Sequence, residues 1–306
     1  MFNLGLEGFQ VVNNEPMDES ILEQMIDGFT TVQNLIVIKN SLVKYGKTPQ
    51  LVDLVGASFE DNGIEFSVEG ILSTIGNFFT WAYNKLKSLL EWFLNLFRKK
   101  KHKSKVDIPN GLIERIDALN LRGASVEEYI LSKEAIQRIN TLMSSGGKIG
   151  SFINKILTET NIHTVVIHTP SVEKAIQDKE QLKEYSKEIT ALVFKKHSYT
   201  TTIDEMLKVR DDIDTALNNL HFPDKNKIGS KIYILGSILK QLKTNPEGDN
   251  TANTIEYIKT QLSCLGLCKQ IISQVVEKLE YDKKSIYSSI KIVVDEAVYQ
   301  ARNNNK

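Results

Sequence analysis

The sequence predicts a mainly α-helical protein with at most a short two-stranded β element. Only six prolines occur among 306 residues, which favours long helices over a loop-rich β fold. Apolar residues recur at helical intervals through most of the chain. Strand-like composition is confined to His163–His168 and, more weakly, to Ala191–Phe194. An apolar fraction of 41% and a charged fraction of 25% are ordinary for a chain that buries one large core or two smaller ones.

The first helix is expected over residues 18–45. Ser20 and Glu23 have the spacing of a capping box, apolar residues follow on one face, and Gly46 can end the helix. A shorter helix is expected over residues 50–55. The N-terminal part of the chain is therefore a helical leader.

A long amphipathic helix is expected over residues 68–99, after a turn-like acidic linker over residues 56–65. Ser67 can cap this helix, and its apolar residues form a wide stripe with a 3.6-residue period. We use the name aromatic stripe for six aromatic residues of this helix: Phe78, Phe79, Trp81, Trp92, Phe93 and Phe97. Lysines and asparagines interrupt the apolar run, so the helix lacks the pattern of a transmembrane span.

The long helix ends in a basic run, and a polar linker over residues 99–110 separates it from a helical body. The basic run consists of Arg98, Lys99, Lys100, Lys101 and Lys103. Helices of the body are expected over residues 110–121, 125–143, 148–160, 171–190, 202–220, 227–243, 251–280 and 283–302. The glycine-rich stretch 144–151 lacks the spacing of a phosphate-binding P-loop, so we expect a turn between two helices there.

Charge divides the chain into three parts. The whole chain is formally neutral, but residues 1–69 hold eleven acidic and three basic residues, a net charge of −8. The remaining residues hold 35 basic and 27 acidic residues, a net charge of +8, of which +7 lies in residues 70–105. We therefore distinguish an acidic leader (1–69), a basic aromatic segment (70–105) and a nearly neutral body (106–306).

A short phrase occurs twice and coincides with this charge step. It reads Gly5-Leu6-Glu7-Gly8 and Ser67-Val68-Glu69-Gly70, a small residue, an aliphatic residue, a glutamate and a glycine. A phrase of this kind at a charge boundary is typical of a processing site. We predict cleavage between Glu69 and Gly70, with a second candidate between Glu7 and Gly8. Cleavage at Glu69 would convert a neutral precursor into a basic product, which polyanions such as DNA attract.

The basic aromatic segment is compatible with three interpretations. Its aromatic stripe can pack on a partner or on the body of the same chain, or it can lie on a membrane surface. Its basic run can contact DNA phosphates without sequence preference, which is compatible with either of the other two.

The sequence contains no recognisable catalytic constellation, so we predict no catalytic residues and no enzyme, cofactor or metal site. Cys264 and Cys268, four residues apart, are expected to be buried reduced thiols because this spacing suits a disulfide poorly. The acidic cluster Asp211, Asp212 and Asp214 lies among basic residues and is interpreted as a solvated, salt-bridged face.

The leader, the Glu|Gly phrases and the aromatic segment together resemble the internal head proteins of large tailed bacteriophages. The phrases ending at Glu7 and Glu69 match the pattern of that family's prohead maturation protease, a small or aliphatic residue, any residue, then glutamate. The resemblance covers about the first third of the chain. It implies a non-enzymatic precursor that enters the prohead with capsid or scaffolding core proteins, loses its acidic propeptide, and remains with the packaged DNA.

The same resemblance implies a location inside the virion head, after assembly in the host cytoplasm, and some members of the family are ejected with the genome. The alternative is a membrane-active ejected factor that uses residues 70–105, or a host-directed effector. An effector would need a concave pocket with convergent polar groups and perturbed titratable residues.

Overall fold

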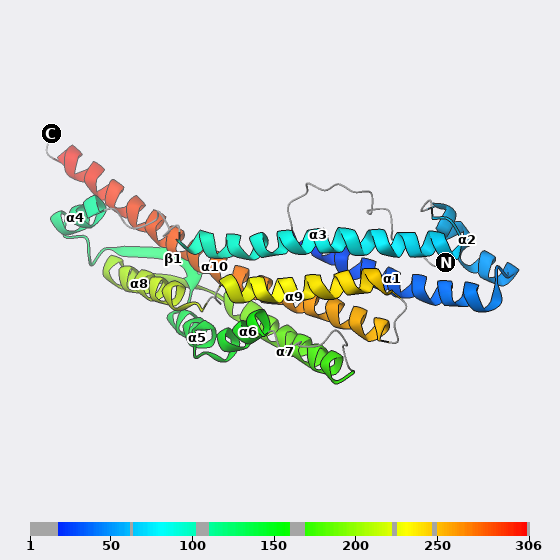
Figure 1. The fold of residues 1–306 in the computed structure, drawn as a ribbon. Coiled ribbons are helices and arrows are strands. Elements are labelled where there is room, and N and C mark those ends of the chain that lie inside the picture. Colours follow the sequence, from blue (N-terminus) through cyan, green and yellow to red (C-terminus); the bar gives the residue numbers. More distant parts are fainter. Residues whose placement is uncertain are drawn as a thin grey trace. The chain divides into compact units, whose positions relative to one another are not determined.

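The computed structural model describes residues 18–61, 64–101, 110–159, 169–221, 225–246 and 250–304. Within these ranges the chain forms ten helices and one two-stranded antiparallel sheet, which confirms the mainly α fold with a short β element (Figure 1). In chain order the elements are α1 Glu19–Tyr45, α2 Pro49–Asp61, α3 Val68–Lys101, α4 Asn110–Ala118, β1 Ser125–Leu131, α5 Lys133–Met143, α6 Lys148–Thr158, α7 Thr169–Val193, β2 Lys196–Thr202, α8 Ile203–Asn219, α9 Lys225–Thr244 and α10 Thr251–Asn304.

The chain divides into two compact units, each assembled from three separate stretches. Unit 1 is drawn from residues 1–95, 156–182 and 223–267, and unit 2 from residues 96–155, 183–222 and 268–306. This division by packing differs from the division by charge at residues 69 and 105. Helix α1 of the acidic leader and helix α9 of the body both belong to unit 1, together with most of α3.

Unit 1 is a helical bundle in which α1 and α9 both lie against α3 (Figure 1). The ring of Phe29 on α1 meets the edge of Phe78 on α3, with 4.9 Å between ring centroids. Gly236 on α9 faces Tyr83 on α3, and a Cβ atom added to this glycine would lie 3.1 Å from the tyrosine ring. The core of unit 1 is therefore built around the aromatic and aliphatic stripe of α3.

Unit 2 contains the sheet and the helices that cover it. Strands β1 and β2 pair in antiparallel register from Ser125 opposite Thr202 to Leu131 opposite Lys196. Helix α8 follows β2 directly, and the Thr202 hydroxyl accepts a hydrogen bond from the Glu205 N–H (3.3 Å), which caps the helix. Helix α5 packs against α8.

The prediction of one helix over residues 125–143 was wrong in its first half, because residues 125–131 form strand β1. Val126 and Ile130 point into the core, as alternate residues of a half-buried strand do. Ser125 and Glu128 have the spacing of a capping box, but Glu128 lies on the strand and accepts a hydrogen bond from the Ser289 hydroxyl on α10. Burial opposes its ionisation, but the hydrogen bonds from Ser289 and the Tyr129 N–H outweigh burial and lower the pKa of Glu128.

The predicted β element exists, but other segments form it. The strand expected at His163–His168 lies outside the described residues, and Ala191–Val193 completes helix α7 instead of forming a strand. The stretch 144–151 does connect two helices, as predicted, with α5 ending at Met143 and α6 beginning at Lys148. A Cβ atom on Gly147 would lie 2.3 Å from the Thr141 carbonyl oxygen, so this turn requires glycine.

Three helix boundaries also differ from expectation. Asp18, not Ser20, caps α1, because its carboxylate accepts the Ile21 N–H at 2.9 Å. Helix α2 extends to Asp61 and absorbs most of the expected linker. The two helices predicted over residues 251–280 and 283–302 form the single helix α10, because Asp282 and Lys283 are buried and paired where a turn was expected.

Candidate functional site

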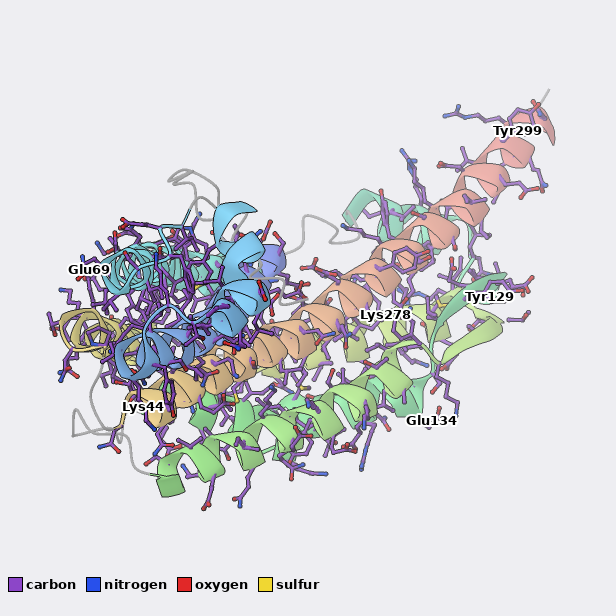
Figure 2. All side chains as sticks on the ribbon, turned by 90° about the vertical axis from the view of Figure 1, so that its right-hand side faces the viewer. Lys44, Glu69, Tyr129, Glu134, Lys278 and Tyr299 are labelled. Carbon is purple, nitrogen blue, oxygen red and sulfur yellow. The ribbon has the colours of Figure 1, made fainter. Side chains whose placement is uncertain are left out.

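The Glu69–Gly70 bond lies in the first turn of α3. The Ser67 hydroxyl accepts a hydrogen bond from the Gly70 N–H (3.0 Å), and the Ser67 carbonyl accepts one from the Ile71 N–H (3.0 Å). This is the geometry of an N-terminal cap, as the sequence predicted. The Glu69 side chain is exposed, at the outer edge of unit 1 (Figure 2), and a carboxylate in the first turn complements the helix dipole.

The chain just before this bond is anchored by apolar contacts. Ile64 is buried, and its N–H donates to the Phe59 carbonyl (2.8 Å). Phe66 meets Phe59 edge-on with 4.9 Å between ring centroids. Residues 64–67 are thus a folded segment immediately before α3. A protease that binds its substrate as an extended strand must first unwind the start of α3, where helices fray most readily.

Gly70 has a structural role that is independent of any processing. A Cβ atom at this position would lie 2.2 Å from the Glu65 carbonyl oxygen and 2.8 Å from the Glu65 Cβ atom. Only glycine allows the chain before α3 to approach the helix so closely. The Glu-Gly phrase at the charge step is therefore also a requirement of the fold.

We expect the substitution Gly70→Ala to lower the free energy of unfolding of unit 1 by about 1–3 kcal/mol, because backbone atoms must move to admit the methyl group. The matched control is Gly76→Ala in the same helix, where an added Cβ has nothing within 4 Å. That control should stabilise the protein by roughly 0.5–1 kcal/mol, the ordinary gain of alanine over glycine in a helix. Denaturant unfolding, followed by tryptophan fluorescence, measures the change in free energy of unfolding for both variants. Equal effects of the two substitutions would contradict the close approach at Gly70.

The aromatic stripe of α3 lies in the core of unit 1. Its described members are at most 9% exposed: Phe78, Phe79, Trp81, Trp92 and Phe93. The side chain of Phe97 lies outside the described part of the chain. Of the interpretations that the sequence left open for these five side chains, the structure shows packing within the same chain. No helix among the described residues is both long enough and apolar enough to cross a membrane.

The other predicted site residues lie partly or wholly outside the described structure. Arg98, Lys99, Lys100 and Lys101 form the last turn of α3, but their side chains are not among those described. Lys103, Glu7 and Gly8 lie outside the described residues altogether. The candidate processing site and residues 98–101 of the basic run therefore lie near opposite ends of the same 34-residue helix.

Unit 1 also contains a cavity of about 390 Å³ that sequence reasoning missed. It is lined by residues from the end of α6 and from α7, α9 and α10, including Glu159, Asp178, Lys174 and Lys231. The Lys174 ammonium lies 3.0 Å from both carboxylate oxygens of Glu159 and 4.0 Å from Asp178. No local sequence pattern indicates this cavity, because its lining comes from four separate segments.

Burial keeps two titratable groups in and near this cavity, Tyr257 and Cys264, in their neutral forms. Burial raises the pKa of the Tyr257 phenol, with smaller contributions from Glu159 and the other nearby acidic groups. Cys264 is fully buried, and burial raises the pKa of its thiol to about 12. A protonated phenol and a protonated thiol are poor bases and poor nucleophiles at neutral pH. The described lining contains no histidine or cysteine to form a nucleophile–base pair.

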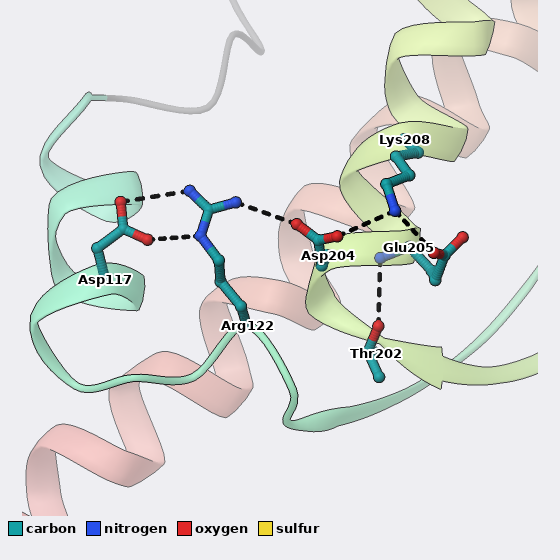
Figure 3. A network of polar contacts seen from close by, with 6 residues as sticks. All are labelled: Asp117, Arg122, Thr202, Asp204, Glu205 and Lys208. Carbon is teal, nitrogen blue, oxygen red and sulfur yellow. Dashed lines mark hydrogen bonds and ion pairs between the residues drawn. The ribbon is translucent and has the colours of Figure 1, made fainter.

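A polar network in unit 2 joins α4 to the start of α8 (Figure 3). The Arg122 guanidinium donates to both carboxylate oxygens of Asp117, at 2.7 and 3.3 Å, and to Asp204 at 3.1 Å. Hydrogen bonds from Lys208 and then from Arg122 lower the pKa of Asp204. All these groups are exposed, so the network fixes a turn and adds little to stability.

Nowhere in the described chain do three or more histidine, cysteine, aspartate or glutamate side chains gather closely enough to hold a metal ion. The fold and site together define a two-unit helical protein with a Glu-Gly junction at the start of the 34-residue helix α3, which carries the aromatic stripe. Comparison with protein-family models, with curated proteins and with solved structures finds no match.

Proposed function

We propose that this chain is the precursor of a non-enzymatic internal virion protein that is cleaved after Glu69. The observation that carries the proposal is the reversal of net charge, from −8 to +8, at a small-X-Glu|Gly phrase. The exposure of Glu69 in the first turn of α3 supports it, since a frayed first turn gives a protease access to the bond.

In this proposal the basic run at the end of α3 lies against the packaged DNA. Four of its members follow one another without a break, from Arg98 to Lys101, and Lys103 comes two residues later. Such a run neutralises phosphates without reading sequence, which suits a protein stored with a whole genome. The proposed partners are the prohead maturation protease, capsid or scaffolding core proteins, and DNA.

The membrane-active alternative is less well supported by the geometry of α3. The five described members of the aromatic stripe would have to leave the core of unit 1 before they could meet lipid. Burial of large apolar side chains is the main force that holds the unit together, so such an opening is costly. We therefore do not propose a membrane function for the folded precursor.

The decisive experiment is mass spectrometry of the protein from purified virus particles, with intact masses and semi-specific N-termini. We expect a chain that begins at Gly70. An intact chain of 306 residues as the only form in mature particles would overturn the proposal.

We expect the substitution Glu69→Gln to abolish this cleavage while the precursor still folds. Glutamine retains the helical propensity, and the lost interaction with the helix dipole costs only about 0.3–1 kcal/mol. The matched control is Glu65→Gln, which removes an exposed glutamate four residues earlier and leaves Glu69 in place. Processing should continue normally in the control. Loss of processing in Glu65→Gln with normal processing in Glu69→Gln would place the cleaved bond elsewhere.

A further inference from the structure

Resting on the proposed cleavage after Glu69, we propose that the cut does not release the acidic leader. Helix α1 remains bound to the rest of unit 1 as a non-covalent subunit, and the aromatic stripe of α3 stays covered. Release of the leader then requires a second event that opens unit 1. The cleaved protein is a two-chain complex until that event occurs.

The contacts of α1 support this inference first. Eight large apolar side chains of α1 are buried along one face: Ile21, Leu22, Met25, Phe29, Val32, Leu35, Ile38 and Leu42. They recur every three or four residues over six turns, which is the pattern of a helix that belongs to a core. The opposite face carries exposed residues such as Val37 and Val43.

The partners of this face lie in the part of the chain that follows the cut. Phe29 is fully buried between Phe78 and Phe79 of α3, with ring centroids 4.9 and 6.4 Å away. A Cβ atom on Gly266 of α10 would lie 2.7 Å from a methyl group of Leu22. Glycine at this position allows α10 to approach α1 closely. Helix α1 is therefore held by two helices of the product.

The second half of the leader also buries apolar side chains, namely Val55 and Phe59 of α2 and Ile64 in the segment that follows. No covalent continuity across residues 69 and 70 is needed for the contacts of α1 with α3 and α10. The leader also carries −8 and the product +8, so long-range attraction favours the complex over the separated chains.

Two consequences follow for the proposed function. The cut alone leaves the complex formally neutral, because both charged parts remain together. The basic product and the apolar face of α3 appear only when α1 leaves. The net charge of the protein therefore changes when unit 1 opens and the leader leaves, not when the protease cuts the chain.

The inference can be tested on the full-length protein with a foreign protease sequence inserted between Asp61 and Ile64, outside α2 and α3. The purified protein is cut to completion, and intact masses confirm two chains. We expect both chains to elute together in size-exclusion chromatography at neutral pH, with unchanged circular dichroism, and to separate only in denaturant. Elution of the N-terminal chain by itself under native conditions would overturn the inference.

Two further measurements identify what holds the chains together. Co-elution should persist at about 1 M salt, where charge attraction is screened to roughly 3 Å. Separation at high salt would overturn the claim that apolar packing retains the leader. In the cut protein, Phe29→Ala should raise the dissociation constant of the two chains about a hundredfold or more. The exposed-face control Val37→Ala should change it by about twofold at most.

These outcomes are distinguishable from failure of the proposed function. If virus particles contain no chain that begins at Gly70, the processing proposal is wrong whatever the artificially cut protein does. If the particles contain that chain but the artificially cut protein falls apart, processing stands and the retention of the leader is wrong.

Discussion

Substitution of Asp282 by alanine is expected to lower the free energy of unfolding of unit 2 by about 3–5 kcal/mol, because it removes the fully buried partner of a largely buried ion pair. Asp282 lies in the middle of α10 and is fully buried. One carboxylate oxygen accepts a hydrogen bond from the Leu131 N–H at the end of β1 (2.9 Å), and the other pairs with Lys278 one turn earlier. Alanine would leave an N–H and an ammonium group without their acceptor.

The measurement can separate the two units because both tryptophans, Trp81 and Trp92, lie in unit 1. Tryptophan fluorescence during denaturant unfolding therefore reports on unit 1, whereas far-ultraviolet circular dichroism reports on both units. Asp282→Ala should shift the circular dichroism transition more than the fluorescence transition. Coincident shifts would mean that the two units unfold together.

The matched control is Glu277→Ala on the same helix. Glu277 is exposed, so its loss should change stability by about 0.5 kcal/mol or less. A second variant, Asp282→Asn, keeps an oxygen acceptor for the Leu131 N–H but removes the charge, and it should fall between the two. An effect of Asp282→Ala as small as that of the control would show that the carboxylate does not join β1 to α10.

The burial of Asp282 and Lys283 also explains why two helices were predicted where the single helix α10 forms. The cluster Tyr281–Lys284 is polar, and polar clusters between periodic segments usually mark turns. Here Asp282 bonds to β1, and Lys283 lies 2.6 Å from Asp214 on α8, so the cluster is internal and the helix continues. Asp214 was interpreted as part of a solvated, salt-bridged face; it is ion-paired, with Arg210 as well as Lys283, but its side chain is partly buried. Local sequence cannot predict the contact of Asp282 with Leu131 or that of Lys283 with Asp214, because the two residues of each pair are at least 69 positions apart.

Hydrophobic periodicity was sufficient to predict an element whose structure depends mainly on its local sequence. The long helix from Val68, its cap at Ser67 and its wide apolar stripe were all predicted from local pattern. The same pattern could not say whether Phe78 and Trp81 meet lipid, a partner or their own core, since all three environments select apolar side chains. Strand β1 was missed because its stability comes from pairing with β2 across about seventy residues.

The candidate processing site shows the same limit. The Glu-Gly phrase is visible in the sequence, but the requirement for glycine at position 70 comes from the approach of the Glu65 backbone. The charge step is likewise visible, whereas the burial of α1 against the helices that follow the cut is not. The net charge of the leader predicts a removable propeptide, whereas the packing of α1 makes the leader part of the core of unit 1.

The substitution Phe29→Ala is therefore expected to be among the most damaging in unit 1, lowering its free energy of unfolding by about 3–5 kcal/mol. Phe29 is fully buried and fills the space between α1 and the two phenylalanines of α3, so truncation to alanine removes all of these contacts. The edge-to-face pair with Phe78 adds roughly 0.5–1.5 kcal/mol beyond burial of the ring, within that total.

Tryptophan fluorescence follows this change directly, since the ring of Trp81 lies 5.8 Å from that of Phe78. The control Val37→Ala, on a side chain that is 64% exposed on the same helix, should leave the transition within about 0.5 kcal/mol of the unaltered protein. A loss of less than about 1 kcal/mol for Phe29→Ala would mean that α1 contributes little to the core. A loss of the expected size would mean that removal of the leader must unfold part of unit 1, because the same contacts hold α1 whether or not the chain is cut at Glu69.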